Sequence, residues 1–581
     1  MDMNDLWYGT SGPRNAEIVL VGESWGAEEE MLSRPFQGPS GKELDRILME
    51  AGLERRQIFC TNVIAQKPKG NDTWRFFNTY SKSQPSLRGL HPTPLVMAEL
   101  DRLYRQISEI RPRLVIVCGN YALWALTECA SVSSESTGDG ATVRVPAGIS
   151  SWRGSMLYPS SSIPVPKIPL LPIFHPAAIL QQWYLRAPTL HDLRVRVKAA
   201  LANDWRPLAS PTILAPPEFH QATYILENWL QRAKTERIRI ANDIETSRRL
   251  ITCIGFADGG FSTPSALALV IPFVRLLPQR RFESFWPPDQ EAILLRLMQR
   301  LLQHPNILVE GQNYLYDTQY IQHWLGVSPK LDFDTMSAHH LLFPGTPKGL
   351  DYLSSLYCRY HWYWKDDNKD WDLKADERTH LEYNGVDCLR TYECATALRA
   401  LVERMGMREL WEWEKQKMAL ALRMMNRGIN IDKQRRSQVG FELAAALGTI
   451  HNRLHYIIPR DIVKPGAPWW TSPIQQRTLF YEILGMEGQR HRKTGRPTVD
   501  DKAMKVLKRK NPEFSRIFDL LEQARSIGVF SSTFIGAELD PDGRMRCSFN
   551  TSGTETFRWS SSSNAFGRGT NLQNVPKGEE E

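Results

Sequence analysis

The chain has 581 residues, a hydrophobic content of 42% and a formal net charge of +8 at pH 7. This length predicts several domains, and the absence of an 18-residue apolar run or a signal-peptide pattern argues against a membrane protein or an exported one. Its eight cysteines include no C-x-x-C pair, which argues against a disulfide framework or a closely spaced zinc site and suits a reducing cytoplasm. The modest positive charge favours polyanionic partners only weakly.

Residues 1–205 show the alternation of strand and helix patterns that predicts a parallel α/β domain. Short apolar runs predict its first strands, at 17–22, 58–64 and 114–119. The stretch 131–168 is rich in Ser, Gly and Pro, so we expect an irregular excursion before a further strand, LLPIF. The polar and proline-rich segment 206–218 is interpreted as a linker.

Three further regions follow the linker. Residues 219–402 are predicted to form a second α/β domain that opens on the strand RIRIANDIE. Residues 403–538 have a mainly helical pattern, and 539–581 form a last, mostly polar segment. The fold class is therefore multidomain, with two α/β domains before a helical region.

Four acidic residues in the second domain have a spacing that suits a metal site: Asp243, Glu245, Asp317 and Asp387. The first two lie two apart in a strand pattern, so both side chains leave the same face. The third follows Asn313 by four residues and the fourth follows Tyr383 by four, which on helices places each pair on one face. Four such acids can bind two divalent cations and leave positions for phosphate oxygens and an attacking water. A tyrosine hydroxyl nearby can orient that water.

This arrangement resembles the DEDDy 3′→5′ exonuclease family, as found in the proofreading domain of family A DNA polymerases. Each spacing alone is common, but the intervening stretch FDTMSAHHLLFPGTPKGLDYLSSLY, residues 333–357, is also similar to that family. The resemblance implies a ribonuclease H-like fold in which the four acids bind Mg²⁺ or Mn²⁺. It also implies that Tyr383 positions the nucleophile and that Asn313 contacts a single-stranded 3′ end.

In the first domain, VGESWGAEEEMLSRPFQGPSGKE and the later FHPAAIL resemble the family-four branch of uracil-DNA glycosylases. The resemblance implies a three-layer α/β fold with a pocket for a base flipped out of DNA. It implies that Phe36 stacks on the base, that Asn62 selects uracil and that His175 stabilises charge on the departing base. It also places Glu23 and Glu29 in the acidic loop that positions water.

Two features depart from the family-four pattern. Trp25 stands at the position of a proline and places a bulky ring at the predicted pocket floor. The four cysteines that hold the family's iron–sulfur cluster are missing, so no iron–sulfur cluster is expected. Whether the domain excises uracil or only binds DNA stays open, because Phe36 can instead be a core residue and His175 can instead cap a loop.

The carboxy-terminal region resembles the helical thumb and the first palm strands of family A DNA polymerases. MALALRMMNRGINID and TSPIQQRTLFYEILGM are similar to the thumb, and TETFRWSSSSN and NLQNVP to palm elements that contact primer–template. The resemblance implies DNA contacts from Thr554, Thr556, Arg558, Asn571, Gln573 and Asn574. Such hydroxyl, guanidinium and amide groups can position a duplex without reading its sequence. Phe557 replaces the usual glycine of this element.

The sequence ends at Glu581, before the palm carboxylates that nucleotide transfer requires, so primer extension by this chain alone is not expected. Our leading hypothesis is the amino-terminal part of a phage-type family A polymerase in the bacterial host cytoplasm. It would provide proofreading and primer–template binding, and a second polypeptide would supply palm and fingers. The alternatives are a stand-alone repair enzyme that excises uracil and trims 3′ ends, and a non-catalytic DNA-binding scaffold.

Overall fold

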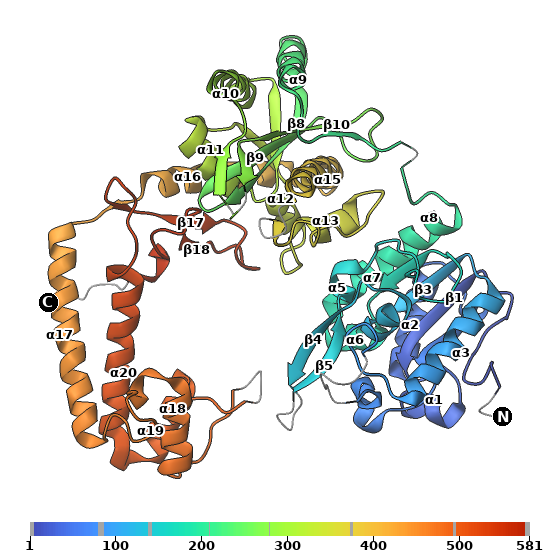
Figure 1. Cartoon of the computed structure of the whole chain (residues 1–581), viewed down its shortest axis with the longest axis horizontal. Coiled ribbons are helices and arrows are strands. Elements are labelled where there is room, and N and C mark those ends of the chain that lie inside the picture. Colours follow the sequence, from blue (N-terminus) through green and yellow to red (C-terminus); the bar gives the residue numbers. More distant parts are fainter. Residues whose placement is uncertain are drawn as a thin grey trace. The chain divides into compact units, whose positions relative to one another are not determined.

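The computed structural model describes residues 5–78, 86–136, 142–207, 209–277, 279, 281–371, 376–491 and 496–575. They form two compact units (Figure 1). The first runs to Gln416 and includes Thr554–Thr556, and the second begins at Lys417 and includes the described residues from Phe557. Within these ranges, no helix combines the length and apolar character needed to cross a membrane.

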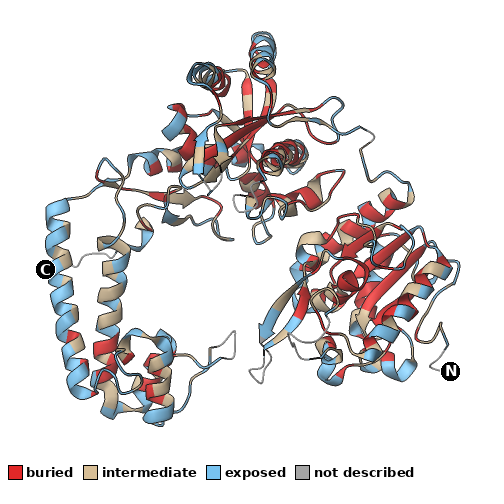
Figure 2. Ribbon diagram, in the orientation of Figure 1, coloured by how far each residue is buried: buried red, intermediate tan, exposed pale blue. Residues whose placement is uncertain are grey.

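The first domain is built on a four-stranded parallel sheet in the order β2–β1–β3–β6. Its strands are almost fully buried, as expected for apolar runs covered by helices on both faces (Figure 2). The strands predicted from the apolar runs and from LLPIF are confirmed as β1 (Ile18–Ser24), β2 (Ile58–Ile64), β3 (Leu114–Cys118) and β6 (Leu170–Ile173). The helices are α1 (Ala27–Leu32), α2 (Pro39–Glu50), α3 (Pro94–Ile110), α4 (Asn120–Leu126), α5 (Ile149–Trp152), α6 (Pro176–Gln181), α7 (Arg186–His191) and α8 (Val197–Leu201).

The expectation of an irregular excursion at 131–168 is wrong for its first part. β4 (Ser131–Ser136) pairs antiparallel with β5 (Thr142–Ala147), and Val132 lies opposite Pro146. Serines fill most of β4, and their polar side chains hide the alternation that identifies a half-buried strand. The rest of the stretch contains the short α5 and then turns and coil before β6.

The second domain contains a six-stranded sheet in the order β14–β13–β8–β9–β10–β7. β8 and β9 pair antiparallel, whereas β13 pairs parallel with β8 and with β14. The strands are β7 (Thr212–Leu214), β8 (Ile238–Ser247), β9 (Leu250–Ala257), β10 (Leu267–Pro272), β13 (Ile307–Gly311) and β14 (Leu331–Asp334), with a separate antiparallel pair of β11 (Val274–Leu277) and β12 (Arg281–Ser284). The segment 206–218, which was interpreted as a linker, contains β7. This strand pairs parallel with β10 and extends the sheet.

Helices cover both faces of this sheet. α15 (Glu377–Arg404) packs across β8, β9 and β10, while α9 (Phe219–Arg232) and α10 (Pro288–Gln303) lie on the opposite face (Figure 1). The remaining helices are α11 (Leu315–Leu325), α12 (Thr335–Leu342) and α13 (Leu350–Tyr357). The long, mostly buried α15 therefore presents its inward side chains along the centre of the sheet.

The second unit is mainly helical, as the pattern predicts. α16 (Arg408–Arg427) begins in the first unit and ends in the second. The other helices are α17 (Lys433–Ile457), α18 (Pro473–Arg477), α19 (Asp501–Lys510) and α20 (Ser515–Phe530). Two short antiparallel pairs follow, β15 (Ile429–Asn430) with β16 (Arg544–Met545) and β17 (Cys547–Asn550) with β18 (Ser560–Ser563).

A buried ion pair links the first domain to α13. The Arg153 guanidinium donates to both Asp192 oxygens at 2.8 and 2.6 Å and to the Ser355 hydroxyl at 2.7 Å. Arg196 donates to the backbone carbonyls of Ser355, Cys358 and Arg359. Because these guanidinium groups are buried, they depend on these acceptors for the hydrogen bonds that water would otherwise supply.

Asp192→Asn is expected to lower the free energy of unfolding of the first unit by about 3–5 kcal/mol, because it leaves the buried Arg153 without its counter-charge. Urea unfolding followed by tryptophan fluorescence measures this loss. The matched control is Glu236→Gln, which breaks the exposed pair with Arg232 and should cost about 0.5 kcal/mol or less. Equal effects of the two variants would contradict a structural role for the buried pair.

Candidate metal centre and amino-terminal pocket

Three of the four predicted metal ligands lie together. Asp243 and Glu245 project from β8, and Asp387 faces them from α15. The candidate ligand atoms of these three carboxylates all lie within 4.8 Å of one another. Carboxylate oxygens this close are a suitable donor set for a hard divalent cation such as Mg²⁺ or Mn²⁺. The residues present therefore fit the predicted metal.

Asp317 lies beside this triad but has a different partner. It is in the first turn of α11 and is buried, and its Oδ1 accepts the backbone N–H of Ile244 at 3.0 Å. It thereby ties α11 to β8 between the two strand carboxylates. Asn313 precedes the helix with a φ of 54°, and its side chain is exposed.

Three donors that the sequence patterns did not identify surround the acids. Asn384 Nδ2 donates to Asp243 Oδ2 at 2.8 Å. Trp364 Nε1 donates to Asp387 Oδ1 at 2.6 Å, and Lys365 Nζ lies 2.6 Å from Asp387 Oδ2. Lys365 Nζ also donates to the Tyr383 hydroxyl at 2.8 Å.

The sequence offered a weak signal for one of these donors. Asn384 follows Tyr383 directly and precedes Asp387 by three residues, so it lies close to them on the same helix. Trp364 and Lys365 lie in YHWYWKDD, outside every predicted motif, and only the path of the chain brings them to Asp387.

Burial and mutual repulsion raise the pKa values of the acids. Burial, with the charge of Asp387, raises the pKa of Asp243 to about 8. Burial and the charge of Asp243 likewise hold the pKa values of Glu245 and Asp317 well above their usual range. For Lys365, burial alone would lower the pKa, but the charge of Asp387 and the interactions with Tyr383 together outweigh it, and the pKa is raised. The cluster is therefore short of positive charge.

In the first domain, all five predicted residues line one pocket of about 180 Å³: Glu23, Glu29, Phe36, Asn62 and His175. The Phe36 and His175 rings are 6.1 Å apart and nearly parallel. A Cβ atom at Gly22 would lie 2.6 Å from the Phe36 ring and 2.7 Å from Asn62 Nδ2, so only glycine allows both side chains to approach the strand. Phe36 itself has a φ of 56°, an uncommon conformation for a bulky residue that is found at functional sites.

The two acids of the loop have different partners. Glu29 accepts hydrogen bonds from the backbone N–H groups of Gly26, Gln37 and Gly38 at 3.1, 2.8 and 3.1 Å, so both of its oxygens hold the loop in shape. Glu23 accepts the N–H of Tyr121 through Oε1 at 3.1 Å. A role of either acid in positioning water stays a prediction.

His175 and Asn62 present polar groups to this pocket. His175 Nδ1 accepts the N–H of Ala177 at 3.2 Å, so the neutral ring carries its proton on Nε2. Burial lowers the pKa of His175, which favours this neutral form. Asn62 donates to the Ser24 carbonyl at 3.4 Å, while its buried Oδ1 has no hydrogen-bond partner among the residues that the structure describes. Trp25 also lines the pocket, and its buried Nε1 is likewise unpartnered.

The predicted primer–template residues divide into two groups. Asn571 caps a short helical turn and accepts hydrogen bonds from the Ser561 hydroxyl and the Gln573 N–H. Thr556, Arg558, Gln573 and Asn574 are exposed, whereas Thr554 is partly buried and its hydroxyl lies 3.3 Å from that of Thr556. Phe557 has a φ of 59°, which is the backbone conformation that glycine adopts readily at this position of the resembled element.

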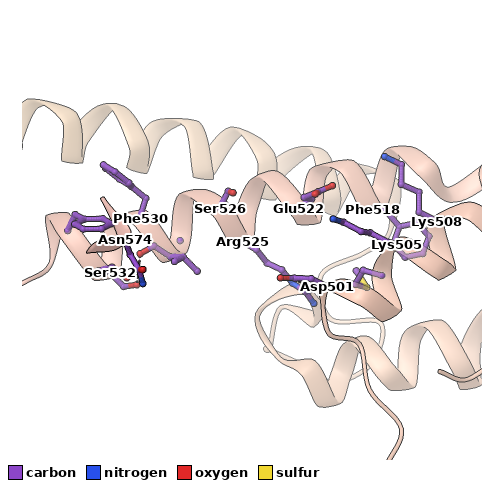
Figure 3. A pocket seen from close by; sticks show the side chains of 15 residues that line it. Asp501, Lys505, Lys508, Phe518, Glu522, Arg525, Ser526, Phe530, Ser532 and Asn574 are labelled. Atoms are coloured by element: carbon purple, nitrogen blue, oxygen red, sulfur yellow. Dashed lines mark hydrogen bonds and ion pairs between the residues drawn. The ribbon is translucent and has the colours of Figure 1, made fainter. Parts of the chain in front are cut away.

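A groove of about 720 Å³ runs beside α20 in the second unit (Figure 3). Lys505 and Lys508 contribute to it from α19, and Arg525 contributes from α20. Asn574 lies at the far end of the groove near Phe530 and Ser532 (Figure 3). Acidic Asp501 and Glu522 also line it, so its charge is mixed rather than uniformly basic.

Comparison with known proteins identifies both domains. Residues 9–197 match the uracil DNA glycosylase superfamily, and residues 282–403 match a 3′-5′ exonuclease family of DNA polymerase A. The chain carries a uracil DNA glycosylase superfamily domain and a polymerase-A-type exonuclease domain. The exonuclease match contains Asp317, Tyr383 and Asp387, while Asp243 and Glu245 precede it.

Individual relatives agree with this division. The type-4 uracil-DNA glycosylase of Saccharolobus solfataricus is 29% identical over 33% of this chain and 74% of its own length. That of Archaeoglobus fulgidus is 33% identical over 19% of this chain and 47% of its own length. DNA polymerase I of Bacillus subtilis is 28% identical over 44% of this chain, but the alignment spans only 28% of the polymerase.

One solved structure is similar at a lower level. The POL domain of Pol1 from M. smegmatis, in complex with DNA primer-template and dNTP, aligns with a TM-score of 0.45 and 19% identity. The alignment covers 64% of this chain and 56% of that chain.

The acid cluster should make metal-free stability depend on pH. The pKa of Asp243 rises from 3.8 to about 8 in the folded chain, so its contribution to stability is complete below 3.8 and is lost as pH rises through about 8. Without metal, the melting temperature of the first unit should decrease as the pH is raised from 6 to 8. Mg²⁺ should raise the melting temperature more at pH 8 than at pH 6. Calorimetry with a chelator or with Mg²⁺ measures both effects. Asp243→Asn should reduce the pH dependence, and an unchanged dependence would contradict this origin.

Proposed function

We propose that this chain is a 3′→5′ DNA exonuclease of the DEDDy type that removes nucleotides from single-stranded 3′ ends by two-metal hydrolysis. The observation that carries the proposal is the convergence of Asp243, Glu245 and Asp387 beside the Tyr383 hydroxyl. The polymerase-A-type exonuclease domain supports the same assignment. Asp317 completes the proposed ligand set from α11.

Each residue has a distinct part in the proposed reaction. Bound divalent cations supply Lewis-acid stabilisation of phosphate charge and lower the pKa of a water molecule. Asp243, Glu245, Asp317 and Asp387 would hold them, and the Tyr383 hydroxyl orients the attacking water. The water oxygen bonds to phosphorus as the bond from phosphorus to the 3′ oxygen of the preceding nucleotide breaks. The released 3′ oxygen takes up a proton, and the last nucleotide leaves as a monophosphate.

Asp243→Asn should reduce the shortening of a 3′-mismatched, end-labelled primer by at least about a hundredfold, because a metal ligand contributes several kcal/mol to the transition state. Denaturing gels with Mg²⁺ or Mn²⁺ measure the rate. Asp289→Asn makes the same chemical change at an exposed position of the same domain and should leave the rate unchanged. Shortening that persists in the Asp243 variant would overturn the proposal.

We propose in addition that the first domain binds a base flipped out of DNA and excises uracil. The pocket that joins Phe36, Asn62 and His175 supports this, together with the glycosylase superfamily match. Phe36 would stack on the base and Asn62 would read its edge. As the glycosidic bond breaks, the Nε2–H of neutral His175 would donate to the departing base, and Glu23 would position the water that replaces it.

Phe36→Ala should reduce uracil excision by about 10–100-fold, because stacking on an aromatic ring is worth about 1–3 kcal/mol per base. Alkali-labile breaks in a uracil-containing strand measure excision. Met49→Ala truncates an exposed apolar side chain of the same domain and serves as the control. The DNA-binding scaffold would be supported instead by two results together. The unaltered chain would produce no alkali-labile break, and its binding to uracil-free strands would be unchanged by Phe36→Ala and Asn62→Ala.

The carboxy-terminal segments are proposed to hold primer–template through the exposed Arg558, Gln573 and Asn574. Primer extension needs palm carboxylates, and we propose that a second polypeptide supplies them. Restored extension when a palm-and-fingers chain is added would support this assignment. Stand-alone repair predicts that both nuclease and glycosylase reactions proceed fully without any added chain.

A further inference from the structure

The segment between α13 and α15 places a cation inside the acid cluster. Lys365 Nζ lies 2.6 Å from Asp387 Oδ2 and 2.8 Å from the Tyr383 hydroxyl. The ammonium also lies 5.2 Å from the centre of the Trp364 ring and 4.9 Å from that of Tyr383. Its side chain is only 25% exposed, so aromatic rings and two oxygen acceptors fix its position.

Both oxygens of Asp387 consequently have protein donors. Trp364 Nε1 occupies Oδ1 at 2.6 Å and Lys365 occupies Oδ2. A divalent cation that uses Asp387 as a ligand therefore has to share an oxygen atom with one of these donors or displace that donor. The Trp364 donor is neutral, whereas the Lys365 ammonium is a charge that repels an incoming cation.

We propose that Lys365 is a positioning residue that acts as an internal counter-ion, which a divalent cation displaces from Asp387. This inference rests on the proposed exonuclease function. The ammonium stabilises the metal-free cluster, in which three carboxylates otherwise repel one another. Once displaced from Asp387, it keeps its second acceptor, the Tyr383 hydroxyl, and directs the proton of that hydroxyl away from itself. Lys365 thus sets the concentration of divalent cation at which the site fills, and it holds in place the tyrosine that orients water.

The test is Mn²⁺ binding to the full chain, with free Mn²⁺ counted by electron paramagnetic resonance at one mildly alkaline pH. Lys365→Met should tighten binding by about tenfold, because the competing charge is gone. Lys365→Arg keeps the charge and should bind Mn²⁺ like the unaltered chain. Lys369→Met is the matched control. Lys369 follows Lys365 by four residues and forms an exposed ion pair with Asp366.

Activity at saturating Mn²⁺ separates the positioning role from competition. Lys365→Met should then show a lower kcat with little change in KM, because Tyr383 has lost its partner. Melting temperatures measured with a chelator establish that each variant is folded. Mn²⁺ affinity in Lys365→Met that equals or falls below that of the unaltered chain would overturn the inference while leaving exonuclease activity standing. Absence of both Mn²⁺ binding and 3′ shortening in the unaltered chain would overturn the inference and the proposed function together.

Discussion

The mutual repulsion of clustered, partly buried carboxylates is the constraint on which the exonuclease domain depends. Two acids on β8 and one on α15 bring their ligand atoms within 4.8 Å, where ionised groups strongly disfavour one another. The domain offsets this with directed donors: Asn384 on Asp243, Trp364 and Lys365 on Asp387, and the Ile244 N–H on Asp317. The arrangement is a set of oxygen ligands that stays together before any metal arrives, at the expense of raised pKa values.

The amino-terminal pocket differs from the acid cluster in how its buried carboxylate is satisfied. Glu29 is also buried, but three backbone N–H groups satisfy its carboxylate, so it shapes a loop instead of attracting a cation. That loop leads to Phe36, whose left-handed backbone turns the ring over Gly22. Among the described residues, Asn62 Oδ1 and Trp25 Nε1 are two buried polar atoms of the pocket's lining residues that have no hydrogen-bond partner. One unit therefore holds a cluster of carboxylates that fits divalent cations and a separate pocket lined by aromatic and amide side chains.

Local patterns predicted those features that depend on local geometry. Asp243 and Glu245 alternate on a strand, and Tyr383 and Asp387 follow helical spacing, so their common faces could be read from the sequence. Trp364 and Lys365 could not be found in this way, because a loop with no period brings them to Asp387. The antiparallel pair of 131–136 and 142–147 was missed because serines hide the alternation of its first strand, and the hydrogen bonds of Glu29 depend on backbone groups that carry no sequence signal. The family resemblances indicated which residues line the two sites, but they did not indicate which polar atoms of these residues have hydrogen-bond partners.

The position of Lys365 depends on contacts well outside the acid cluster. Arg390 on α15 lies over the Trp362 ring at 4.0 Å and donates to the Tyr360 carbonyl, which anchors the aromatic segment from the helix side. Arg196 of the first domain anchors the start of the same segment through the carbonyls of Cys358 and Arg359. Because Lys365 is six residues beyond Arg359, displacement of this anchor can move the ammonium relative to Asp387. The first domain therefore contacts, through a buried guanidinium, the start of the segment that carries Lys365.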